Sequence, residues 1–134
     1  MTLSTNANLA ALFLRLALGV MFLSHGLLKL LVFTPAGTAG FFASLGLPGE
    51  VGYLAIAAEV IGGVLLILGY RVQLVVIALL PLLVGSILFV HGAKGWAFAN
   101  EGGGWEYSAF LIVASIAQVL LGKGSFAAPI PGNK

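Results

Sequence analysis

The sequence predicts an all-α membrane protein, a bundle of four transmembrane helices with a short interfacial helix or loop between the first two. Hydrophobic residues make up 60% of the 134 residues and charged residues only 7%, whereas average soluble domains carry about 25% charged residues. The apolar residues lie in long segments, and about 20 such residues are enough to cross a bilayer. Four such segments account for most of the chain, so we expect residues 1–134 to form a single membrane domain.

We expect the four apolar segments to form helices near residues 9–32, 51–70, 72–91 and 105–121. The first is longer than the apolar region of a signal peptide and contains charged residues, which favours a helix that is retained. The tail, 122–134, carries two prolines and is expected to be disordered.

The connection between the first two helices, 33–52, is long and apolar. Within it, residues 38–45 are expected to form a short helix that Gly46 and Pro48 terminate. Because a bare loop does not face lipid, we expect this helix to lie in the membrane interface or to cap the bundle.

Two features of the composition exclude whole classes of function. The chain has no cysteine, which excludes disulfides, thiolate metal sites and cysteine nucleophiles. The net charge is only +2 and no basic cluster exists, so we expect no nucleic-acid partner and no metal site.

The basic residues predict the orientation. With four crossings, the N-terminal tail shares one side of the membrane with Arg71, Lys123 and Lys134, and the other side has only Lys29 and Lys94 near its loops. The positive-inside rule then places both termini in the cytoplasm.

Glu59 is the most informative single residue, because it lies in the middle of the second apolar segment. An acidic side chain at the centre of a membrane helix costs about 2.5–3.5 kcal/mol on insertion scales, so it needs a partner, water or a proton. The small residues Ala55, Gly62 and Gly63 lie near the same helical face and allow a neighbouring helix to approach closely. Two interpretations remain open, a structural ion pair between helices and a functional site.

The first helix supplies the expected partners of Glu59. His25 and Lys29 are four residues apart and lie within about 40° of each other around the helix, while Arg15 lies about 80° or less from both. Because consecutive helices are antiparallel, His25 and Glu59 are at similar depths, about 10 and 12 Å from the outer end of their helices. Lys29 lies one turn nearer the outside, so Glu59 is expected to pair with either His25 or Lys29. We therefore expect a polar site of these three residues, with Arg15 too deep to join it.

Further polar and aromatic residues converge at the outer end of the bundle and form the expected rim of this site: His91, Trp96, Trp105 and Glu106. Tryptophan favours the membrane interface, and an acidic residue at a helix N-terminus is also stabilised by the helix dipole. Such a site is suited to binding a polar head group or to exchanging protons. A quinone, whose carbonyl oxygens need donors such as His or Lys, is one candidate ligand.

Four sequence motifs, taken in order, resemble the DoxX family of small bacterial membrane proteins. They are RLALGVMFLSHGLLKL at 15–30, GTAGFFASLGLP at 37–48, AEVIGGVLLILGYR at 58–71 and GGGWEYSAFLI at 102–112. The resemblance covers nearly the whole chain. The family pattern falls on His25, Lys29, Glu59, Glu106 and Tyr107.

The resemblance implies a four-helix bundle in the bacterial inner membrane and a redox-associated function that involves a quinone. It leaves open whether the chain is itself an oxidoreductase or the membrane subunit of one. Since the chain has no cysteine and no flavin or dinucleotide motif, hydride chemistry or a thiosulfate oxidoreductase activity would require a soluble or membrane-bound redox partner.

Three other functions remain open alongside the quinone hypothesis. A small proton-coupled transporter would use Glu59 as its membrane carboxylate. A haem protein would use His25 and His91 as axial ligands, although these lie at different depths. A structural or assembly subunit would use the buried charges only to fix helix pairing. In all of these cases the lipid bilayer surrounds the chain. The glycine-rich helix faces also suit a homo-oligomer.

Overall fold

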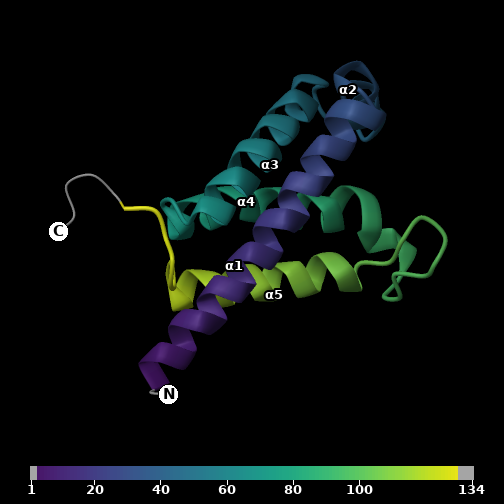
Figure 1. The fold of residues 1–134 in the computed structure, drawn as a ribbon. Coiled ribbons are helices and arrows are strands. Elements are labelled where there is room, and N and C mark those ends of the chain that lie inside the picture. Colours follow the sequence, from purple (N-terminus) through teal and green to yellow (C-terminus); the bar gives the residue numbers. More distant parts are fainter. Residues whose placement is uncertain (1–2, 130–134) are drawn as a thin grey trace.

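The computed structural model describes residues 3–129 and is built from helices over that range (Figure 1). The five α-helices are α1 (Leu3–Leu27), α2 (Pro35–Ser44), α3 (Glu50–Leu68), α4 (Val72–Ser86) and α5 (Glu106–Leu121). Two of them continue as π-helical turns, α1 through Leu28–Val32 and α4 through Ile87–His91, and a 3₁₀ turn follows at Gly92–Lys94.

Three stretches of the described chain are long and apolar enough to cross a membrane: Ser4–Val32, Glu50–Leu68 and Val72–Lys94. The predicted fourth segment forms α5, which has 16 residues and is therefore about 24 Å long. Large apolar side chains project outward on all sides, among them Phe13, Leu54, Leu88 and Leu120. An apolar surface of this extent fits a lipid environment, so the chain is a membrane protein with at least three helices suited to spanning.

Two helices begin earlier than the sequence predicts. The expected first helix, 9–32, starts at Leu3, because the polar residues ahead of the apolar segment continue the same helix. The short helix expected at 38–45 starts at Pro35, where proline occupies the first turn and the Thr34 hydroxyl accepts a hydrogen bond from the Gly37 amide at 3.1 Å. Proline at the first helical position and threonine before it are ordinary helix-start features.

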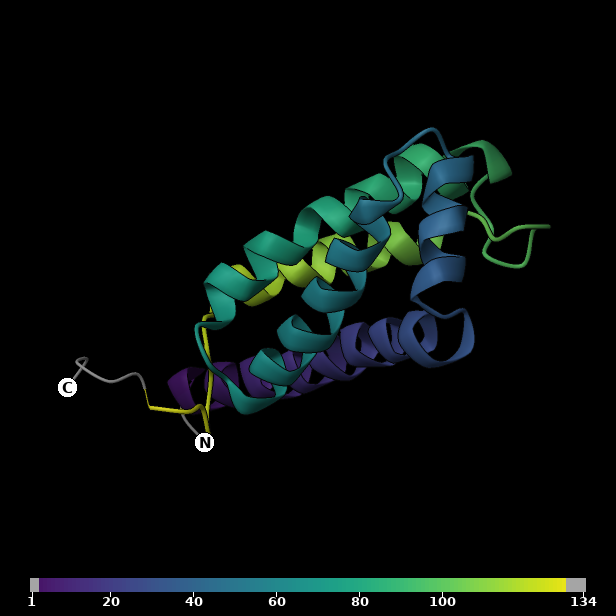
Figure 2. The same ribbon diagram turned by 90° about the horizontal axis from the view of Figure 1, so that it is seen from above.

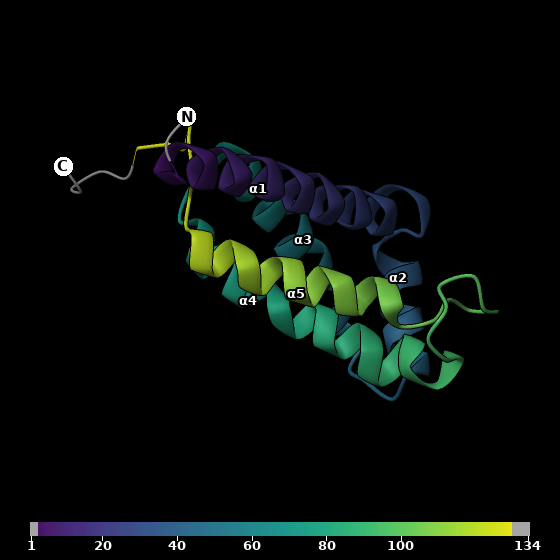
Figure 3. The same cartoon turned by 90° about the horizontal axis from the view of Figure 1, so that it is seen from below.

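The helices pack as two pairs, α1 with α3 and α4 with α5. Figures 2 and 3 show α2 and the loop before α5 at one end of the molecule, and the start of α1 with the end of α5 at the other. All four long helices contribute to one buried cluster, formed by Leu18, Phe22, Leu66, Val72, Val75, Val76, Leu79, Leu83, Leu111 and Ala114. Helix α5 therefore belongs to the same bundle as the three longer ones.

Glycines bring α1 and α3 into direct backbone contact. A Cβ atom added to Gly63 would lie 2.6 Å from the Leu23 amide nitrogen and 2.8 Å from the Gly19 carbonyl oxygen. Gly26 follows Gly19 by seven residues in α1, and a Cβ atom added to it would lie 2.9 Å from the Val60 amide nitrogen. This close approach is the small-residue packing that membrane helices use, and it fixes the depth of α1 relative to α3.

Arg15 lies at the opposite end of the bundle from α2 and is fully buried. Its guanidinium donates to the carbonyl oxygens of Lys123 (2.8 Å) and Phe126 (3.3 Å), just beyond the end of α5. It also lies against Gly69, the left-handed residue that terminates α3, where any side chain would collide with the guanidinium. The negative ends of two helix dipoles therefore surround this cation and stabilise it, and no carboxylate among residues 3–129 pairs with it.

The described part of the C-terminal tail, 122–129, packs against the ends of the helices. Where we expected disorder throughout 122–134, the described part lies along the bundle, with the Ser125 amide bonded to the Asn8 carbonyl (3.1 Å) and the Ala128 amide to the Leu68 carbonyl (2.9 Å). The carbonyl groups bound by Arg15 belong to the same segment. The part of the tail beyond Pro129 lies outside the described residues.

Candidate functional site

Lys29 and Glu59 form an ion pair between α1 and α3. The Lys29 ammonium lies 2.8 Å from Oε2 and 3.1 Å from Oε1 of Glu59, so it donates to both carboxylate oxygens. The side chains are 22% and 10% exposed, and within residues 3–129 no other salt bridge is found. Of the two pairings expected for Glu59, the structure forms the one with Lys29 and not the one with His25.

The local backbone places this ion pair. The close approach at Gly26 brings α1 against the turn of α3 that carries Glu59, whose Cβ lies 3.0 Å from the position a Gly26 side chain would take. Lys29 itself lies in the π-helical turn, and its carbonyl accepts a hydrogen bond from the buried hydroxyl of Thr38 on α2 at 3.2 Å. Turns of this kind often occur at functional sites, and here the turn connects the ion pair to α2.

His25 faces α5 rather than Glu59. Its Nδ1 lies 2.7 Å from the Met21 carbonyl oxygen, and because a carbonyl only accepts, Nδ1 carries a proton and donates. The imidazole stacks on the Tyr107 ring, with centroids 6.2 Å apart and planes 29° apart. The Tyr107 hydroxyl in turn donates to Met21 Sδ at 3.6 Å. The imidazole is thus held between the Met21 carbonyl and the Tyr107 ring.

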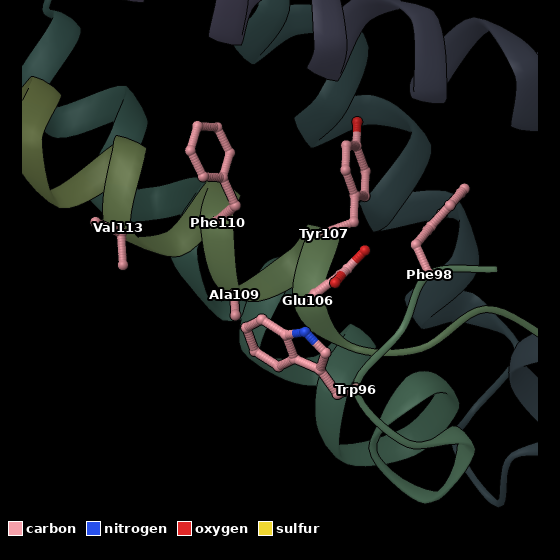
Figure 4. A pocket seen from close by; sticks show the side chains of 7 residues that line it. All are labelled: Trp96, Phe98, Glu106, Tyr107, Ala109, Phe110 and Val113. Atoms are coloured by element: carbon pink, nitrogen blue, oxygen red, sulfur yellow. The ribbon is translucent and has the colours of Figure 1, made fainter. Parts of the chain in front are cut away.

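A pocket of about 590 Å³ opens beside Tyr107 and is lined by Trp96, Phe98, Glu106, Tyr107, Ala109, Phe110 and Val113. In Figure 4 the Glu106 carboxylate lies between the Trp96 indole and the rings of Phe98 and Tyr107. Further along α5, Phe110 and Val113 are 69% and 65% exposed, so the pocket continues onto an apolar outer face of the helix. The volume is in the range of small-molecule sites, about 300–1,000 Å³.

The loop before α5 folds back to complete the pocket. The Trp105 amide donates to the Gly95 carbonyl (2.9 Å) and the Glu106 amide to the Trp96 carbonyl (3.0 Å). Trp105 then packs edge-on against Trp96 at 4.6 Å between centroids. These contacts hold the Trp96 indole over the first turn of α5, so Trp105 supports the pocket wall without lining it.

His91 lies at the end of the π-helical turn that follows α4. Its Nδ1 is 2.8 Å from the Gly103 carbonyl oxygen, so it donates to the loop that carries Trp105. It does not line the pocket. Its role in the structure is to attach the end of α4 to this loop.

The predicted site residues therefore divide into three neighbouring groups rather than one. Lys29 and Glu59 form the ion pair, His25 stacks on Tyr107, and Trp96 and Glu106 line the pocket. Among the described residues, no cluster of three or more His, Asp or Glu side chains could hold a metal ion.

Four of the residues that line the pocket were not predicted from the sequence: Phe98, Ala109, Phe110 and Val113. Tyr107 was indicated only by the family pattern. A pattern in the sequence could have found the last two, because Phe110 and Val113 follow Glu106 by four and seven residues and so share its helix face. Phe98 reaches the pocket only through the fold of its loop. Its ring lies 5.6 Å from that of Tyr107.

Comparisons with known proteins agree with the resemblance in the motifs. The DoxX family model matches residues 10–92, a range that contains His25, Lys29 and Glu59 and ends before the pocket loop. The chain is 34% identical over 115 residues to the protein named "Putative oxidoreductase CatD" from Bacillus subtilis (strain 168), covering 86% of this chain and 81% of that protein. No solved structure matches. The chain belongs to the DoxX family.

Proposed function

We propose that the chain is a quinone-interacting, redox-associated protein of the bacterial inner membrane, and that the pocket on α5 receives the quinone ring. The observation that carries this proposal is an aromatic pocket that continues onto the apolar face of α5, next to the stacked pair of His25 and Tyr107. A quinone moves within the bilayer, and its flat ring fits between aromatic side chains. Its apolar tail would lie along the exposed face of α5.

The polar groups beside the pocket suit the proton side of quinone chemistry. Reduction of a quinone to a quinol takes up two electrons and two protons, and Glu106 and His25 are groups that can carry a proton. The electrons would come from a redox partner, because the chain has no cysteine and no flavin or dinucleotide motif. The name of the Bacillus subtilis relative, "Putative oxidoreductase CatD", supports a redox association. We therefore propose that this chain is the membrane-bound quinone site of a larger assembly.

In this proposal the ion pair of Lys29 and Glu59 positions the site. The Lys29 ammonium supplies the partner that Glu59 needs in the middle of α3. It thereby fixes α1 against α3 at the level where His25 meets Tyr107. Loss of the pair is then expected to weaken quinone binding through a shift of α1.

Quinone binding to the purified protein tests the proposal. Ubiquinone and menaquinone analogues are titrated in detergent, and the melting temperature is recorded for the wild type, His25→Ala, Glu59→Gln and the control Glu101→Gln. A ligand at 100 times its Kd stabilises a folded protein by about 2.7 kcal/mol, so the wild type and Glu101→Gln should show a saturable rise. His25→Ala and Glu59→Gln should show a smaller one.

If no quinone raises the melting temperature saturably, although the wild type remains folded and monodisperse, the proposal is wrong. If quinones raise the melting temperature of the wild type and of a folded His25→Ala variant equally, the quinone ring does not bind beside His25. The Glu101→Gln control has the same charge change as Glu59→Gln in an exposed loop, so it separates a local effect from a change in net charge.

The proposed topology has four crossings, with α5 as the fourth and both termini in the cytoplasm. Because the chain has no cysteine, single cysteines report the side of each loop. Ser44→Cys and Ala99→Cys should react with a membrane-impermeant maleimide added to spheroplasts, and Arg71→Cys and Lys123→Cys should react only after lysis. Labelling of Lys123→Cys in intact spheroplasts, with Arg71→Cys protected, would mean that α5 does not cross.

A further inference from the structure

The carboxylate of Glu106 has no ion-pair partner within residues 3–129 and lies in a pocket lined by aromatic rings. The salt bridge found among residues 3–129 joins Lys29 and Glu59 and does not involve Glu106. The hydrogen bond that Glu106 donates to the Trp96 carbonyl comes from its backbone amide. Its position in the first turn of α5 places it at the positive end of that helix dipole. In the part of the chain that the structure describes, the pocket therefore holds an acidic side chain without a basic partner.

The walls around this carboxylate are aromatic on several sides. Trp96, Phe98, Tyr107 and Phe110 all line the pocket, and Figure 4 shows the first three around the carboxylate. The face of an aromatic ring attracts a cation within about 6 Å of its centroid, and rings grouped around one space are the usual recognition site for quaternary ammonium groups. A carboxylate among such rings adds full charge complementarity.

Two of these rings, those of Trp96 and Tyr107, are held in place by neighbouring side chains of the protein. Trp105 contacts the edge of Trp96, and the His25 imidazole stacks on Tyr107. A pocket with fixed walls loses less side-chain entropy on binding, so preformed rings favour affinity.

We propose that this pocket binds lipophilic organic cations, quaternary ammonium or phosphonium ions that carry apolar substituents. The charge of the ligand would lie beside Glu106 among the rings, and its substituents would lie along Ala109, Phe110 and Val113. A small hydrated cation lacks the apolar surface to use that face. This ligand class goes beyond the proposed quinone, because a quinone is uncharged and its binding requires no carboxylate, and cation binding requires no redox partner.

The probe is tetraphenylphosphonium, and the matched probe is tetraphenylborate, which has nearly the same size and shape and the opposite charge. Each is titrated separately into the purified full chain in detergent, with empty micelles as the blank. The chain has two tryptophans, and both Trp96 and Trp105 lie at the pocket, so their fluorescence reports occupancy directly. Saturable quenching by the phosphonium ion, at least about tenfold tighter than by the borate, is the expected result.

Three variants localise the binding. Glu106→Gln removes the charge and should weaken phosphonium binding about tenfold, while Glu101→Gln, the same change in the exposed loop, should leave it unchanged. Phe110→Leu removes one ring at an exposed position where folding is insensitive, and it should weaken binding to a smaller extent. Because the comparison of the two ions is made on the wild type, the inference stays testable even if Glu106→Gln does not fold.

Equal affinity for the two ions, or an equal loss in Glu106→Gln and Glu101→Gln, would overturn the inference. Quinone binding without phosphonium binding would overturn it as well and leave the proposed function standing. Phosphonium binding without quinone binding would support it and remove the proposed function.

Discussion

Replacing Gly63 with alanine is expected to destabilise the packing of α1 on α3 more than alanine at Gly19 or Gly26 would. The added Cβ would lie 2.6 Å from the Leu23 amide nitrogen and 2.8 Å from the Gly19 carbonyl oxygen. Both are backbone atoms of α1, so no side-chain rotation relieves the contact and the two helices must separate. Overpacking of this kind costs about 1–3 kcal/mol and sometimes more. Gly63→Val should be worse, since a larger side chain enters the same space.

A matched control lies in another spanning helix. A Cβ added to Gly85 in α4 would meet only the Phe89 ring, at 3.9 Å, which is ordinary contact. Gly85→Ala should therefore be neutral or stabilise the helix by about 0.5–1 kcal/mol. Unfolding in mixed micelles by an increasing fraction of sodium dodecyl sulfate gives both values. Equal stabilities of Gly63→Ala and Gly85→Ala would show that α1 and α3 are not in backbone contact.

The separation of α1 and α3 should also reach the site. Gly26 makes the same kind of contact close to Glu59, and the ion pair with Lys29 depends on it. A folded Gly63→Ala variant is therefore expected to be less stable than the wild type. Quinones should also raise its melting temperature less. The two effects share one cause, a shift of α1 along or away from α3.

The sequence was sufficient to predict the three long apolar helices and the pairing of Lys29 with Glu59 as one of two alternatives. Long apolar segments locate helices, and antiparallel order places His25, Lys29 and Glu59 near one level. The choice between the two partners of Glu59 depends on the rotation of α1, which follows from the backbone contact at Gly26. Helical periodicity alone does not distinguish side chains about 40° apart around the helix.

The pocket could not be predicted in the same way, because it depends on contacts between segments far apart in the chain. His25 meets Tyr107 only because α1 also packs on α5. Trp96 reaches Glu106 only because the intervening loop folds back through backbone hydrogen bonds. The position of Arg15 is a similar case: its acceptors are carbonyl groups of the C-terminal segment, and a backbone carbonyl leaves no trace in the sequence.

Removing one member of the Lys29–Glu59 pair is expected to be the most costly polar change in the protein. Breaking a buried ion pair costs about 3–5 kcal/mol, because the remaining charge is left without a partner. The two single variants, Glu59→Gln and Lys29→Met, should differ in how much stability they lose. Lys29 is near the outer end of its helix and has a long side chain, so in Glu59→Gln its ammonium can move toward the interface. In Lys29→Met the Glu59 carboxylate stays in the middle of α3 and must be dehydrated or take up a proton, which is the larger cost.

The double variant Lys29→Met with Glu59→Leu distinguishes an unpaired charge from lost packing. Replacement of both partners by apolar side chains of similar volume is often neutral or stabilising, so the double variant should recover most of the stability lost in Lys29→Met. If all three variants unfold at the same detergent composition as the wild type, the pair contributes nothing to the bundle. If the double variant is as stable as the wild type but no longer binds a quinone, the pair is retained for the geometry it imposes on His25 and not for the stability of the helices. That outcome would make Glu59 a positioning residue for the pocket, and it would explain a charge in the middle of a membrane helix that the fold itself does not require.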